Sequence, residues 1–368
     1  MQKDTNAALA AGTQERVKNQ KAIQAKRILI GVDVHLRSYF AARKVDNAAV
    51  GVVSRFKSQE ELLLYVEKQK AYAQEVVVLY ETGPLGYTLY RGLKAAGVSC
   101  SVCAPDSSQQ QSKRRKNDAI DARTLTGNLF NYLSGNPKAL QLVRIPTEQQ
   151  ERVRLKSRQH DQLVKERKRL AAQGNSLLLA QGYGSWKNWW RPRAFSRLSQ
   201  LIPEWIKQLL ISWVDVLRSL DQTIAKSKVM LAKSYRGPRP KGAGAASLFQ
   251  LGSEVLDWGL STNRRQPGCL AGMVPSEWSS GGSQRQGPIT QVGVPAIRRI
   301  ITEMVWRIIL FQPQYGPVQK WKPVLEGPNR ALKKKAVVAI GRQLMVNLWQ
   351  LHTGRASAQE LNLIMMEG

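Results

Sequence analysis

Four carboxylates stand at positions where acids can converge on one site. Asp33 closes an apolar run, and Glu81 directly follows another, residues 76–80. In a parallel sheet the ends of such strands adjoin the ligand crevice. Asp118 and Asp121 are three apart in a predicted helix and share a face. Converging carboxylates repel one another and become stable together when divalent cations lie between them; hard oxygen ligands suit Mg²⁺ or Mn²⁺. Paired metals can activate an attacking oxygen and stabilise a leaving oxygen at a phosphodiester.

A run of four cations lies just before the helix predicted to carry Asp118 and Asp121. These cations could neutralise phosphates at a metal site, although a solvated basic loop would have the same composition. Each acid alone also has an ordinary explanation, because aspartates are common in turns and Asp118 could simply cap its helix. The prediction therefore depends on the four acids in combination. The cations are Lys113, Arg114, Arg115 and Lys116.

A second candidate group is Ser279-Ser280-Gly281-Gly282, within a predicted polar loop over 279–287. A serine is a poor nucleophile unless a base or metal ion activates it, and no base is adjacent in the sequence. A flexible Gly/Ser loop without chemistry is therefore the alternative. Arginines nearby could hold a scissile phosphate. They are Arg285, Arg298 and Arg299.

The histidines and cysteines show no metal-ligand spacing. His35 lies two residues from Asp33, so a strand would place both on one face, while the other two histidines are distant in sequence. Cys100 and Cys103 are three apart in a predicted strand, where side chains three apart point to opposite faces, so we interpret them as structural. Three cysteines form no disulfide framework, which indicates a reducing cytoplasm.

The charge of the chain indicates a polyanionic partner. Its 368 residues include 56 Lys and Arg against 26 Asp and Glu, a net charge of +30, and nucleic acid is the expected partner. A membrane surface would also attract this charge. However, no apolar run approaches the ~18 residues of a spanning helix, so no membrane is expected. The hydrophobic content of 43% is sufficient for a core.

Strand and helix patterns alternate before residue 146. Strands are predicted at 28–34, 38–45, 50–56, 76–80 and 98–104, and helices at 59–70, 85–96 and from 118. The order β-β-β-α-β-α-β-α matches a ribonuclease-H-like, RuvC-like α/β domain. We expect a basic flexible arm over 1–27, this domain over 28–145, a helical region over 146–235 and a C-terminal helical domain over 243–368, with helices at 296–310 and 331–351.

The region from 148 to 233 has almost no strand pattern and is predicted to be helical. Its basic segment could follow phosphates, with Arg154 and Arg158 as candidate contacts, although a solvated helix face looks similar. Leucines repeat every seven residues, as in a coiled coil, but a plain amphipathic helix would also fit. Three tryptophans among basic residues could stack on unpaired bases or fill a core. The leucines are Leu163, Leu170 and Leu177, and the tryptophans are Trp186, Trp189 and Trp190.

Two sets of motifs resemble those of one transposase group. Ile30-Gly-Val-Asp-Val-His35, Tyr80-Glu-Thr-Gly-Pro84 and Lys116-Asn-Asp-Ala-Ile-Asp-Ala-Arg123 resemble its DEDD motifs. Leu270-Ala-Gly-Met-Val-Pro275, Ser280-Gly281, Gly287-Pro-Ile-Thr290, Gly293 and Arg298 resemble the motifs of its second domain. The group is the insertion-sequence-110 transposase family, also called bridge recombinases and related to pilin-gene invertases. The resemblance covers about residues 28 to 350 in consistent order.

The resemblance implies a RuvC-like domain joined through a coiled coil to a small helical transposase domain. It implies that the four acids bind magnesium and that Ser280, which directly precedes the motif glycine, attacks DNA to form a phosphoserine link. Ser279 is the fallback nucleophile and Ser283 the third choice. The resemblance further implies a Holliday-junction-like intermediate, an element-encoded bridge RNA that pairs with donor and target DNA, and assembly into dimers and tetramers.

The motifs depart from the family pattern at three positions. Asn117 replaces the threonine of Lys-Thr-Asp, and Gln291 and Val294 replace residues of Ile-Thr-Lys-x-Gly-Asn, which changes the expected local phosphate contacts. One alternative function is a RuvC-like, structure-selective nuclease, which leaves the C-terminal third unexplained. Another is a noncatalytic nucleic-acid-binding protein derived from a transposase. The intact set of acids argues against the second, since clustered negative charge would weaken phosphate binding.

Overall fold

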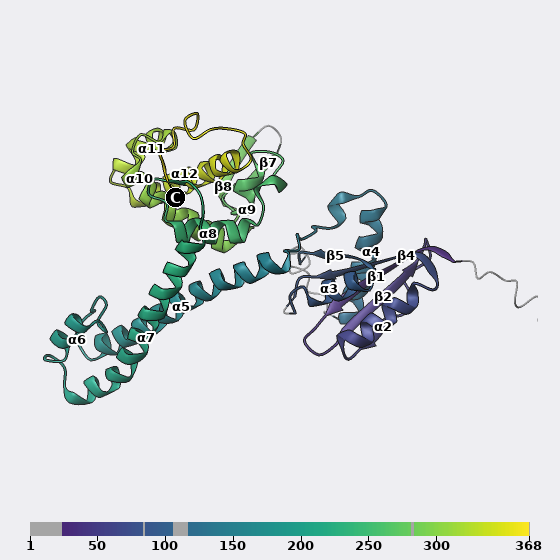
Figure 1. Ribbon diagram of the computed structural model, residues 1–368, viewed down its shortest axis with the longest axis horizontal. Helices are drawn as coiled ribbons and strands as arrows, with labels where there is room; N and C mark the ends of the chain where they lie inside the picture. Colours follow the sequence, from purple (N-terminus) through teal and green to yellow (C-terminus); the bar gives the residue numbers. More distant parts are fainter. Residues whose placement is uncertain (1–23, 84, 106–116, 281–282, 368) are drawn as a thin grey trace, which may run out of the picture. The chain divides into compact units, whose positions relative to one another are not determined.

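The computed structural model describes residues 24–83, 85–105, 117–280 and 283–367. The chain divides into two units, Met1–Ile145 and Pro146–Gly368. The first contains the sheet and the second is mostly helical (Figure 1). The predicted basic arm, apart from its last four residues, and the cations Lys113 to Lys116 lie outside the described residues.

The first unit is built on a five-stranded mixed sheet. Its strand order is β3-β2-β1-β4-β5, with β2 antiparallel to β1, and with β1, β4 and β5 parallel. The predicted order of elements is confirmed and is consistent with a ribonuclease-H-like domain, although β3 is shorter than expected. The elements are β1 (Ala25–Val34), β2 (Tyr39–Val45), β3 (Ser54–Phe56), α2 (Gln59–Gln69), β4 (Ala73–Glu81), α3 (Thr88–Ala95), β5 (Ser99–Cys103) and α4 (Asp118–Leu133).

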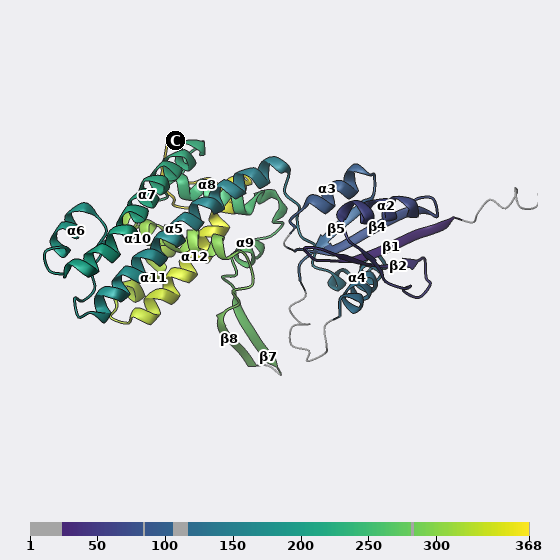
Figure 2. The ribbon, with the colours of Figure 1, turned by 90° about the horizontal axis from the view of Figure 1, so that it is seen from below.

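Helices cover both faces of this sheet, because each central strand is apolar on both sides. Figure 2 shows α2 and α3 on one face and α4 on the other. Along β1, Ile30 faces the core beneath α2 and α3, while Leu29 faces the core beneath α4. Cys100 belongs to the first core and Cys103 to the second, so the opposite-face prediction is confirmed. Burial raises the pKa of both thiols to about 12.

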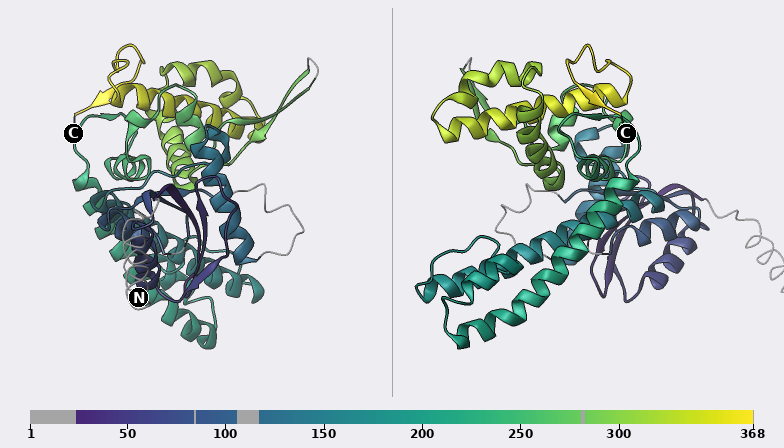
Figure 3. Two further views of the ribbon diagram at one scale, coloured as in Figure 1. Left: turned by 90° about the vertical axis from the view of Figure 1, so that its right-hand side faces the viewer. Right: turned by 60° about the vertical axis from the view of Figure 1, so that its left-hand side comes forward.

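Two long helices, α5 (Glu148–Ala180) and α7 (Glu204–Ser234), lie side by side in the second unit (Figure 3). The predicted tryptophan cluster fills their core, together with α6 (Pro192–Leu198). Trp189 and Trp190 are buried, and their indole N–H groups donate to Ala171 O at 2.9 Å and to Asp221 Oδ2 at 2.8 Å. Base stacking by these two rings is therefore excluded, because they already pack inside the protein.

The rest of the second unit packs around α10 (Pro295–Phe311) and α12 (Arg330–His352). The predicted helices at 296–310 and 331–351 are confirmed. The predicted loop over 279–287 is wrong for its described residues, because 279–280 end β7 (Pro275–Ser280) and 283–287 belong to β8 (Ser283–Ile289), and the two strands pair as an antiparallel ribbon. The other elements are η2 (Pro137–Ala139), β6 (Arg239–Pro240), α8 (Ala245–Val255), η3 (Trp258–Leu260), α9 (Gln266–Leu270), α11 (Gly316–Glu326) and β9 (Met365–Met366).

Within the described ranges, no helix is both long enough and apolar enough to cross a membrane.

Candidate active site

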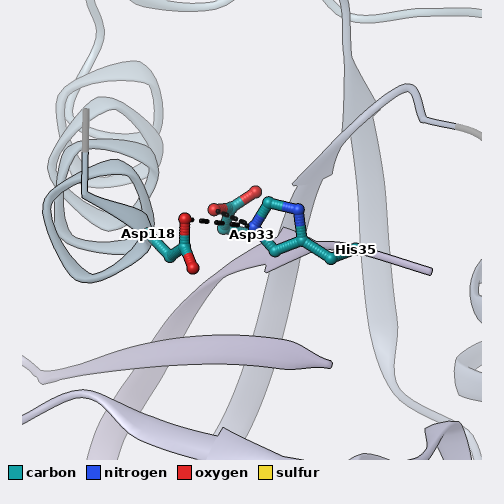
Figure 4. Close-up of side chains that lie close together, drawn as sticks. All are labelled: Asp33, His35 and Asp118. Atoms are coloured by element: carbon teal, nitrogen blue, oxygen red, sulfur yellow. Dashed lines mark hydrogen bonds and ion pairs between the residues drawn. The ribbon is translucent and has the colours of Figure 1, made fainter. Parts of the chain in front are cut away.

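Three side chains meet where β1 approaches the start of α4. His35 Nε2 lies 3.1 Å from Asp33 Oδ2 and 3.3 Å from Asp118 Oδ1 (Figure 4). One ligand atom from each residue falls within 4.8 Å of the other two, as one metal ion would require. Two carboxylates and an imidazole form a donor set for a divalent cation.

Asp33 is the most buried of the three side chains. Its carboxylate is 20% exposed, against 45% for His35 and 46% for Asp118. Burial raises the pKa of Asp33, the nearby His35 opposes that rise, and the negative charges of Asp121 and Asp118 add to it. Asp121 therefore also acts electrostatically on this site. The protein holds negative charges together here at a cost that a bound cation would offset.

Helix α4 supplies two acids from its first turn. Asn117 caps the helix, since its side-chain oxygen accepts a hydrogen bond from the Ala119 N–H at 3.1 Å. Asp118 and Asp121 follow within the first turn, where the positive end of the helix dipole favours carboxylates. Asn117, which departs from the family pattern, thus has a defined structural role.

A close contact fixes α4 against β1. The Gly31 N–H donates to Thr126 Oγ1 at 3.0 Å, and this hydroxyl lies 2.8 Å from Ala122 O. A Cβ at Gly31 would lie 2.4 Å from the Thr126 nitrogen, which is closer than side chains approach backbone. Only glycine fits here. Because Gly31 precedes Asp33 by two residues, the same contact sets the spacing between Asp33 and the acids of α4.

Glu81 is the last residue of the neighbouring parallel strand β4, and it lies at the same end of the strands as Asp33. Val32 pairs with Tyr80 in the parallel ladder, so Asp33 and Glu81 are the next residues of β1 and β4. The charge of Glu81 adds to the effect of burial in raising the pKa of Cys103. Asp33 and Glu81 therefore lie at the C-terminal ends of adjacent parallel strands, as the sequence indicated.

His35 was not among the predicted site residues, yet its ring lies between Asp33 and Asp118. The two-residue spacing from Asp33 had indicated that both side chains lie on one face of a strand, so His35 was expected near the acids but was assigned no role. The sequence did not show that α4 would bring Asp118 to the same imidazole. That contact joins residues that are 83 positions apart.

The candidate serine belongs to the second unit. Ser280 is the last residue of β7, and its backbone pairs with Ser283 at the start of β8. Ser279 precedes it and pairs with Gln284. All three candidate serines therefore lie at one end of the ribbon.

The arginines that were predicted to contact nucleic acid differ in exposure and in their partners within the protein. Arg285 is exposed on β8. Arg298 donates to Ala271 O at 2.9 Å, and Arg299 contacts Asp161 at 2.5 Å. Arg154 and Arg158 both face one buried carboxylate of α8, so each has a partner inside its own unit; their contacts to nucleic acid stay predictions. That carboxylate is Glu254, 3.7 Å from Arg154 and 2.9 Å from Arg158.

Comparisons with known proteins agree across the chain. A transposase family model matches residues 30–181, and a model of the transposase IS116/IS110/IS902 family matches residues 240–317. The Sinorhizobium fredii protein y4rJ, named as a candidate transposase, is 29% identical over 317 residues, which span 77% of this chain and 80% of that relative. The transposase for insertion sequence element IS1533 of Leptospira borgpetersenii is 28% identical over 141 residues, 38% of this chain and 39% of its own.

Among solved structures, that of Thermus thermophilus RuvC matches 32% of this chain and 99% of its own, with 10% identity and a TM-score of 0.22.

Proposed function

Because the chain belongs to the IS116/IS110/IS902 family of transposases, we propose that it cuts and rejoins DNA with two sets of residues, one from each unit. The first set is the acidic group of the sheet. The second is Ser280 at the end of β7. The observation that carries the proposal is the convergence of Asp33, His35 and Asp118 within 4.8 Å.

We assign a divalent cation to the acidic group, with Mg²⁺ favoured over Mn²⁺. The residues fit such an ion, since a half-buried carboxylate with a raised pKa lies beside two further acids. Asp33, His35 and Asp118 would hold it, with Asp121 and Glu81 completing the acidic surroundings. When bound, the ion supplies charge neutralisation at a scissile phosphate.

Ser280 is the proposed nucleophile. Its hydroxyl oxygen would bond to phosphorus and its proton would pass to a base. The bond from phosphorus to one DNA oxygen would break, and that oxygen would take up a proton and leave as a hydroxyl. The resulting phosphoserine conserves a phosphodiester bond, which allows the strand to be rejoined without an external energy source. Support comes from the motif around Ser280 and from its place at the end of the ribbon.

The partners are proposals of the same kind. We propose donor and target DNA as substrates, an element-encoded bridge RNA as the guide, and dimers or tetramers that combine acids and serine from different copies. The net charge of +30 supports binding of polyanions, and it suits RNA with DNA as well as DNA alone.

The test uses a plasmid carrying the gene with its native flanking DNA. Amplification across the abutted element ends detects excised circles in wild type, Ser279→Ala and Ser280→Ala, at equal protein levels. Loss of circles only with Ser280→Ala is expected. Persistence in Ser280→Ala would refute this serine as nucleophile and favour metal-dependent hydrolysis. Circles at the wild-type level in Asp118→Ala would refute the metal assignment.

A further inference from the structure

An exposed tryptophan stands on the ribbon that carries the candidate serine. Trp278 of β7 is 65% exposed, and Figures 2 and 3 show β7 and β8 extending away from the helices of their own unit. The apolar area of such a ring is normally buried, since it is among the largest that any side chain offers. Its exposure on a projecting ribbon leaves the ring available to bind a partner.

Gly287 on the opposite strand leaves the space that the Trp278 indole occupies. A Cβ at Gly287 would lie 2.3 Å from Trp278 Cζ3 and 2.6 Å from Ser276 Oγ, so only a residue without a side chain lets the ring lie there. Ser276 Oγ in turn donates to Pro288 O at 2.8 Å, which holds the strand beside the ring. The ring therefore lies against the backbone of the opposite strand.

The charge beside the ring is positive. Arg285 is directly opposite Trp278 in the ladder and is exposed. Paired residues share a face and have Cβ atoms about 5 Å apart. Glu277, the neighbouring acid, belongs to the other face of the ribbon because side chains alternate along a strand. An aromatic ring beside a guanidinium is the combination that binds a base and its phosphate together.

We propose that Trp278 and Arg285 form a binding site for unpaired DNA, in which the indole stacks on a base and the guanidinium contacts the adjacent phosphate. This inference rests on the proposed function, because it takes the strand bound at the ribbon to be the one that Ser280 attacks. Two residues along a strand span about 7 Å, which is about two steps of stacked bases. A strand bound at this site would therefore pass close to the end of β7 that carries Ser280.

The experiment measures binding of the full chain carrying Asp33→Asn, so that DNA is not cut. The probe is an oligothymidine of about 20 nucleotides, compared with a duplex of equal length at low and high salt. High salt screens the general charge attraction but not stacking, so the ring's contribution is clearest there. Trp278→Ala should weaken high-salt binding of oligothymidine about 10-fold, and duplex binding less.

Two further variants test the geometry. Trp278→Phe keeps an aromatic face and should retain most of the affinity, while Gly287→Ala displaces the ring and should behave like Trp278→Ala. Trp205→Ala is the matched control, since this tryptophan is 51% exposed on α7 in the same unit, and its removal should leave binding unchanged. Circular dichroism verifies that each variant is folded.

The result that overturns the inference is an unchanged high-salt affinity in folded Trp278→Ala, or an equal loss in Trp205→Ala. A larger loss for oligouridine than for oligothymidine would assign the ribbon to RNA and would also overturn it. The proposed function is judged separately. Excised circles in wild type with no role for Trp278 in binding would remove only the stacking site, while Trp278-dependent binding without circles would remove only the recombinase.

Discussion

A single methyl group at Gly31 should disturb the acidic site without touching it. A Cβ at this position would lie 2.4 Å from the Thr126 nitrogen and 2.6 Å from Ala122 O, both of them backbone atoms of α4. Restoring an ordinary contact of 3.4 Å requires α4 to move by about 1 Å. Because α4 carries Asp118 and Asp121, that movement would separate them from Asp33.

Gly31→Ala should therefore reduce the yield of excised circles about 100-fold, the usual effect of a 1 Å misplacement at a reacting centre. Overpacking should also lower the free energy of unfolding by about 1–3 kcal/mol. Quantitative amplification of the circle junction measures the first effect, and urea unfolding of the full chain followed by circular dichroism measures the second. The matched control is Gly127→Ala in the same helix. Nothing lies within 4 Å of a Cβ there, so this change should be neutral or slightly stabilising.

Thr126→Val tests the same contact from the other side. Valine keeps the shape of threonine but leaves the buried Gly31 N–H without its acceptor, at a cost of about 1–3 kcal/mol. Thr126→Ser retains the hydroxyl and should keep most of the activity. Wild-type stability and circle yield in both Gly31→Ala and Thr126→Val would refute the view that this contact positions the acids of α4.

Three further predictions concern other parts of the chain. Mg²⁺ should raise the melting temperature of the wild type, and Asp33→Asn should abolish both this rise and circle formation, while its metal-free stability stays equal or increases because a half-buried charge is removed. A Mg²⁺ response in Asp33→Asn equal to that of the wild type would contradict the metal assignment. Cys269 is exposed and should react with a thiol reagent at pH 8, whereas the buried Cys100 and Cys103 should react only after unfolding, because their pKa values are near 12. Fast labelling of three thiols in the native protein would contradict this prediction. Glu254→Gln should destabilise the second unit by roughly 3 kcal/mol in urea unfolding, because its carboxylate, which is 2% exposed, forms ion pairs with two arginines. An unchanged unfolding curve would show that these ion pairs contribute nothing to stability.

The tryptophan cluster and the serine region show why local composition misleads. Trp189 lies among basic residues, which fits a nucleic-acid surface as well as a core. Its burial is decided by Gly174, where a Cβ would lie 2.0 Å from the ring, and α5 and α7 then enclose it. Residues 283–287 are polar enough for a loop, yet they pair with β7, because backbone hydrogen bonding needs no apolar side chains.

The sequence alone determined the order of strands and helices in the first unit and indicated the four acids as candidates, because apolar periodicity and strand-end positions are local properties of the chain. It also carried the two motif sets on which family membership rests. Only the tertiary structure placed His35 between Asp33 and Asp118. It also paired Arg154 and Arg158 with Glu254, and it packed the Trp278 ring against Gly287. These contacts join distant positions, and each depends on the angle and distance at which packed elements meet, which no local pattern encodes.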